Sequence, residues 1–142
     1  MQYVDWSKAD TEDPPHTFRL LGFGVVLWAV VLGVAMAMGS WRTTNRPLFE
    51  SMIAVTLATA TVVMMTVHLR RVSWGFLRAG ALAGVIWPAV SVALDMVVFS
   101  TGPMKMAFSD YVQDIALTYL MIPVIAMGMA YQRGVTFDRA RG

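Results

Sequence analysis

Four acidic residues lie inside or at the edge of long apolar runs, where ionisable side chains are uncommon. Glu50 stands near the start of the second run, Asp95 lies within the third, and Asp110 and Asp114 open the fourth. The last two are four residues apart, so a helix would carry them on one face. Carboxylates in an apolar setting bind protons or cations, or pair with basic side chains. This acidic cluster is where the sequence most strongly indicates chemistry.

Other common kinds of site have no support in the sequence. The chain has no cysteine, which excludes disulfides and thiolate metal sites. His16 and His68 fall at different depths, so they cannot hold a haem between them, and we expect His68 to lie at a membrane interface. No nucleophile elbow, phosphate-binding loop or dinucleotide motif occurs. We therefore expect no catalytic residue, no metal and no cofactor.

The acids are carried by four apolar runs that are each long enough to cross a bilayer. A hydrocarbon core about 30 Å thick requires roughly 20 residues of helix, and the chain is 57% hydrophobic and only 14% charged. A membrane barrel would need at least about eight short strands, and backbone groups in lipid are otherwise satisfied only in helices. We therefore predict an all-α integral membrane four-helix bundle with spans at residues 20–40, 48–67, 79–99 and 111–131.

The distribution of basic residues predicts the orientation of these spans. With a cytoplasmic amino terminus, eight basic residues lie inside and three lie outside, which fits the excess of positive charge expected in cytoplasmic segments. The inside set is Lys8, Arg19, Arg70, Arg71, Arg78, Arg133, Arg139 and Arg141, and the outside set is Arg42, Arg46 and Lys105. We therefore place the tails, residues 1–19 and 132–142, in the cytoplasm of a bacterium, with the spans in its inner membrane. We expect the first run to be retained as a span, because no cleavable signal peptide precedes it.

Aromatic residues support the span edges. Tyr111 and Tyr131 bracket the fourth run, as interfacial anchors do, whereas Trp28 and Trp87 fall in the middle of spans. For the two mid-span tryptophans we expect packing or lipid contact.

In this orientation all four acids lie on the outer side of the membrane. Glu50, Asp110 and Asp114 stand near helix amino ends, where the dipole favours negative charge, but Asp95 stands near a carboxyl end. A carboxylate in hydrocarbon costs about 2.5–3.5 kcal/mol, so Asp95 needs a partner. One interpretation is that the acids pair with bases, for which Arg42, Arg46 and Lys105 are at hand. The other is an outward-facing cavity that binds a proton or a cation.

Small residues at four-residue spacing predict two helix-contact faces. One is Ala29, Gly33 and Ala37 in the first span, and the other is Gly80 and Gly84 in the third. Small side chains let helix backbones approach closely in lipid. The pattern does not distinguish a contact within one chain from a contact between chains.

These observations favour a non-enzymatic component, either an accessory subunit of a membrane complex or a structural membrane protein. The alternative is a small proton- or cation-linked transporter or channel that uses the outer acids. The expected partners are the lipid bilayer and either further copies of the chain or a larger membrane complex. Nucleic acid is not expected, because the basic residues stand at span ends rather than in one patch with interleaved aromatics.

Overall fold

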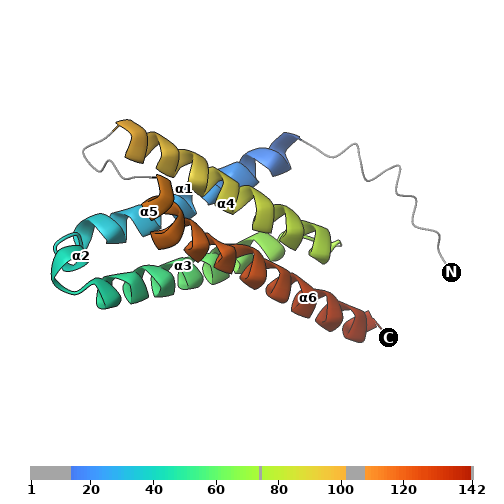
Figure 1. Cartoon of the computed structure of the whole chain (residues 1–142). Helices are drawn as coiled ribbons and strands as arrows, with labels where there is room; N and C mark the ends of the chain where they lie inside the picture. Colours follow the sequence, from blue (N-terminus) through green and yellow to red (C-terminus); the bar gives the residue numbers. More distant parts are fainter. Residues whose placement is uncertain (1–13, 74, 102–107, 142) are drawn as a thin grey trace.

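The described part of the chain is almost entirely helical. The computed structural model describes residues 14–73, 75–101 and 108–141 (Figure 1). In chain order the elements are α1 (Pro14–Ala37), α2 (Trp41–Thr44), α3 (Arg46–Leu69), α4 (Phe76–Thr101), α5 (Phe108–Asp114), the 3₁₀ helix η2 (Ala116–Leu120) and α6 (Met121–Arg141). Because these ranges contain no strand, the prediction of an all-α fold is confirmed for them.

Three helices are long and apolar enough to cross a membrane. They are Thr17–Ala37, Arg46–Leu69 and Phe76–Thr101, and they contain most of the first three predicted spans. Large apolar side chains point outward along them, including Val55 on α3 and Val85 and Val97 on α4. A soluble protein seldom exposes so much contiguous apolar surface, whereas lipid requires it.

The fourth predicted span, residues 111–131, is not one continuous α-helix. α5 ends at Asp114, a turn at Ile115 follows, and η2 leads into α6. Pro123 lies in the first turn of α6, where its missing N–H is tolerated, but its ring would clash with the carbonyl of Tyr119 if the α-helix continued backward. α6 then runs on through the predicted tail to Arg141. A fourth membrane crossing stays a prediction.

The long helices alternate in direction. α4 packs on α6 and α1, and α3 packs on α6 and α1. Gly24 and Trp28 of α1 meet progressively later residues of α4, so these two helices run the same way. Gly80 and Gly84 meet progressively earlier residues of α6, which therefore runs oppositely. The end of α3, the start of α4 and the end of α6 accordingly point to one side of the bundle, on the right in Figure 1.

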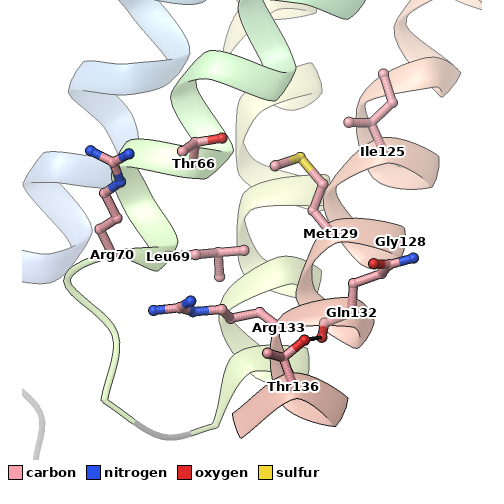
Figure 2. A pocket seen from close by; sticks show the side chains of 9 residues that line it. All are labelled: Thr66, Leu69, Arg70, Ile125, Gly128, Met129, Gln132, Arg133 and Thr136. Carbon is pink, nitrogen blue, oxygen red and sulfur yellow. Dashed lines mark hydrogen bonds between the residues drawn. The ribbon is translucent and has the colours of Figure 1, made fainter.

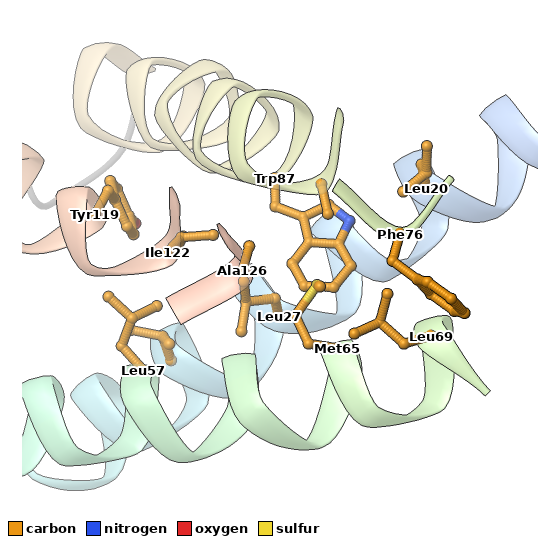
Figure 3. Close-up of a cluster of buried hydrophobic side chains, with 12 residues drawn as sticks. Leu20, Leu27, Leu57, Met65, Leu69, Phe76, Trp87, Tyr119, Ile122 and Ala126 are labelled. Atoms are coloured by element: carbon orange, nitrogen blue, oxygen red, sulfur yellow. The ribbon is translucent and has the colours of Figure 1, made fainter. Parts of the chain in front are cut away.

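Trp87 of α4 forms the centre of the core. Its side chain is fully buried and points toward α3, as Figure 3 shows, where it lies among Leu27, Met65 and Ala126. His68 packs edge-on against Trp87, at 6.2 Å between ring centroids. His68 is buried within the protein, and its position at a membrane interface stays a prediction. The packing role predicted for Trp87 holds.

The two predicted contact faces differ in outcome. Gly80 and Gly84 lie where α4 crosses α6: a Cβ on Gly80 would stand 2.5 Å from the Cβ of Ala130, and one on Gly84 would stand 3.0 Å from the Cα of Pro123. The other stripe is exposed, and nothing lies within 4 Å of a Cβ built on Gly33. Within the part of the chain that the structure describes, Ala29, Gly33 and Ala37 therefore form no contact face, because α4 and α3 pack on the opposite side of α1.

Candidate functional site

Asp95 accepts hydrogen bonds from three neutral side chains. Trp28 Nε1 donates to Oδ1 at 2.7 Å, and the hydroxyls of Tyr111 and Tyr119 donate to Oδ2 at 3.0 and 2.7 Å. The donors come from α1, α5 and η2, while the acid itself is in α4 and is only 4% exposed. One carboxylate thus joins four separate elements of the fold.

The break in the fourth predicted span accounts for the convergence of the two tyrosines. Tyr111 and Tyr119 are eight residues apart, which in an uninterrupted α-helix means about 12 Å along the axis. The turn at Ile115 redirects the chain between them. Both phenol groups can then reach the same oxygen of Asp95. Tyr111 is buried within the protein because its hydroxyl bonds to this acid, and its role as an interfacial anchor stays a prediction.

The hydrogen bonds to Asp95 come from neutral donors, and the described residues include no basic partner for it. Hydrogen bonds to a charged group contribute about 1.5–3 kcal/mol each, which offsets much of the cost of burying a carboxylate. Among the described residues no Lys or Arg lies within ion-pair distance of Asp95. Arg42 and Arg46 therefore form no ion pair with Asp95. Lys105, the third predicted partner, lies outside the described ranges. The donors are neutral because all three are aromatic side chains of neighbouring helices.

Glu50 is paired instead. Its Oε1 accepts from Arg46 Nε at 2.7 Å, one helical turn away on α3, and both side chains are more than half exposed. Such exposed pairs typically contribute at most about 1 kcal/mol. The interpretation of paired acids therefore describes Glu50 but not Asp95.

A cavity of about 370 Å³ connects most of the predicted cluster. Asp95, Glu50, Arg42 and Arg46 all line it, although they belong to α4, α3 and α2. Its other walls are largely apolar and aromatic, formed by Trp28, Val31, Leu32, Ala35, Met36, Gly39, Phe49, Ile53, Leu57, Phe99, Ile115, Thr118 and Tyr119. The structure thus brings four of the six predicted cluster residues together. The side chains of the other two, Asp110 and Asp114, lie outside what the structure describes.

The arrangement leaves Asp95 chemically available. Oδ2 accepts two hydrogen bonds but Oδ1 accepts one. A carboxylate oxygen has about two acceptor positions, so Oδ1 retains one. In an apolar cavity this oxygen can take a proton, an inorganic cation or a cationic group of a ligand.

Sequence reasoning missed the three donors. The sequence predicts packing or lipid contact for Trp28 and an interfacial position for Tyr111, and it does not single out Tyr119. The helical register offered no signal for them, because they come from different elements and two are joined through an irregular turn. A mid-span tryptophan opposite a mid-span acid was the one available hint, since a buried indole N–H needs an acceptor.

Comparison with known proteins adds no assignment to this geometry. No protein-family model, no curated protein and no solved structure matches this chain.

Proposed function

We propose that the chain is a small multi-pass membrane protein that crosses the bilayer four times, with both termini in the cytoplasm of a bacterium. The alternating directions of α1, α3, α4 and α6 support this topology, as does the excess of basic residues on the predicted inner side. The fourth crossing would combine the irregular η2 with α6. Irregular backbone is tolerated at membrane depth where it is buried in protein or lines a cavity.

Reporter fusions test this topology. Fusions within α2, between Trp41 and Thr44, should report the outside, and fusions after Arg70 or Arg141 should report the cytoplasm. The physical reason is that a short loop with few basic residues is translocated more readily than a basic one. A carboxyl terminus that reports the outside would show that α6 does not cross the membrane.

We further propose that the protein acts as a small proton- or cation-linked transporter or channel, with Asp95 as the binding residue. The observation that carries this proposal is that the Asp95 carboxylate is held by neutral donors at the wall of a 370 Å³ cavity. A purely structural acid in lipid is expected to be neutralised by a basic partner. Asp95 has no basic partner among the described residues, so a proton or cation from the cavity can take that place.

The residues around the cavity fit this role. Trp28 and Tyr119 fix the carboxylate in place, so a bound ion would meet a pre-positioned ligand. Arg42, Arg46 and Glu50 line the same cavity and would adjust the local potential. Aromatic walls add the option of cation–π contact with an organic cation.

Labelling with a hydrophobic carbodiimide tests the binding residue directly. This reagent adds to carboxyl groups in apolar surroundings, so we expect an adduct on Asp95. Peptide mass spectrometry of the protein in nanodiscs would locate it. The matched control is Asp138→Asn, an exposed acid of α6 remote from the cavity, which should leave the adduct on Asp95 unchanged. Absence of an adduct on Asp95 at every pH at which the protein remains folded would argue against an exchangeable site.

A second candidate is an accessory or structural component of a larger membrane complex. It is favoured by the exposed stripe of Ala29, Gly33 and Ala37, which none of the described helices covers. Mass measurement of the protein purified in mild detergent would reveal a stoichiometric partner or a homo-oligomer. A monomer without partners would remove the support for this candidate.

A further inference from the structure

A second cavity, of about 690 Å³, lies at the other end of the bundle. It is formed between α3 and α6 by Thr66, Leu69, Arg70, Ile125, Gly128, Met129, Gln132, Arg133 and Thr136 (Figure 2). None of these residues lines the cavity around Asp95. It is a separate groove and is not explained by the function proposed for that acid.

The groove combines apolar and basic side chains. Ile125, Met129 and Arg133 follow at four-residue spacing and so lie on one face of α6. Arg70 stands at the end of α3, and Figure 2 shows Arg133 extending from α6 toward that end. The groove therefore has apolar side chains along α6 and one guanidinium group on each wall: Arg133 extends from α6 toward the end of α3, and the Arg70 side chain turns back along α3 toward the level of Thr66.

The two arginines and the side-chain amide of Gln132 are the donors that remain for a ligand. The hydroxyls of Thr66 and Thr136 already donate to carbonyl oxygens of their own helices, at 2.8 and 2.9 Å. Within the described residues neither Arg70 nor Arg133 has a carboxylate at ion-pair distance. Guanidinium groups bind phosphate through paired N–H donors, and basic pockets between membrane helices bind anionic headgroups.

We propose that this groove binds one anionic phospholipid, with its phosphate between Arg70 and Arg133 and an acyl chain along Ile125 and Met129. The order of the groove matches an amphiphile that enters from the membrane, tail toward the bilayer centre and head at its surface. A free phosphate would use only the polar donors. Gly128 contributes no side chain to the wall, and nothing lies within 4 Å of a Cβ built on it, so space for the chain is left there.

The test uses the full-length protein in detergent, with phosphatidylglycerol as the probe and phosphatidylcholine as the neutral comparison. Native mass spectrometry would count retained lipids, and thermal unfolding would measure stabilisation. We expect phosphatidylglycerol to bind preferentially and to raise the unfolding midpoint. Arg70→Gln and Arg133→Gln should each weaken its binding about fivefold, the factor that corresponds to one basic residue near an anionic headgroup.

Two further variants separate a built site from diffuse attraction. Gly128→Leu changes no charge but fills the apolar part of the groove, and it should weaken lipid binding without destabilising the protein. Arg139→Gln removes the same charge elsewhere on α6 and should leave binding unchanged. Equal losses in Arg139→Gln and Arg70→Gln, equal binding of both lipids, or equal stabilisation by inorganic phosphate would each overturn the proposal. These outcomes do not depend on Asp95.

Discussion

Replacing Gly80 with leucine is expected to separate α4 from α6 and destabilise the protein by about 3 kcal/mol or more. Even a methyl group at this position would stand 2.5 Å from the Cβ of Ala130 and 2.9 Å from the carbonyl oxygen of Ala126. The second contact is with backbone, which cannot move aside without bending α6. A leucine side chain adds three more carbon atoms at the same crossing. Unfolding in detergent, followed by circular dichroism, measures the loss.

Two further variants make this prediction specific. Val85→Leu adds volume on the same helix but on its exposed face, where the side chain is 68% exposed, and should change stability by no more than about 0.5 kcal/mol. In the double variant Gly80→Ala with Ala130→Gly, the methyl group moves from α6 to α4, so part of the stability lost in Gly80→Ala should return. If Gly80→Leu and Val85→Leu are tolerated equally well, α4 and α6 do not cross at Gly80.

The positions of the first three long helices could be predicted from the sequence, because they follow from the hydropathy of the apolar runs. The first three apolar runs correspond to the three helices that are long and apolar enough to span. The gathering of Asp95, Glu50, Arg42 and Arg46 could also be anticipated, since the predicted orientation places them all at the same end of the spans. These features depend on segment length and charge, which the sequence displays directly.

Features that depend on partners across helices could not be predicted in the same way. Helical periodicity identifies which residues of one helix share a face, but not which other helix covers that face. The stripe of Ala29, Gly33 and Ala37 resembles the Gly80–Gly84 face in sequence, yet only the latter meets another helix of this chain. The burial of His68 against Trp87 was missed for the same reason. The interruption at Ile115 was missed because no Gly or Pro marks it, the next Pro along the chain being Pro123.

Asp95→Asn is expected to abolish ion movement while the fold is retained. The amide keeps one acceptor oxygen, and its NH₂ group can donate to a tyrosine hydroxyl, but it cannot be deprotonated or attract a cation. Asp95→Leu should behave differently, because it leaves the donors of Trp28, Tyr111 and Tyr119 without an acceptor. Each buried donor left unsatisfied costs about 1–3 kcal/mol, so the leucine variant should unfold at clearly lower temperature. Comparing the two variants separates loss of binding from loss of structure.

The measurement that tests the role of Asp95 most directly is proton and cation flux in proteoliposomes. Vesicles would contain the purified protein and a pH-sensitive dye, and a potassium diffusion potential would drive ions inward, with sodium added or omitted. We predict that wild type and the matched control Asp138→Asn change the internal pH faster than protein-free vesicles do. Asp95→Asn, reconstituted to the same density and equally stable, should match the protein-free rate. Equal flux through wild type and Asp95→Asn would contradict the assignment of Asp95 as the binding residue, and it would leave this acid as a structural hydrogen-bond acceptor.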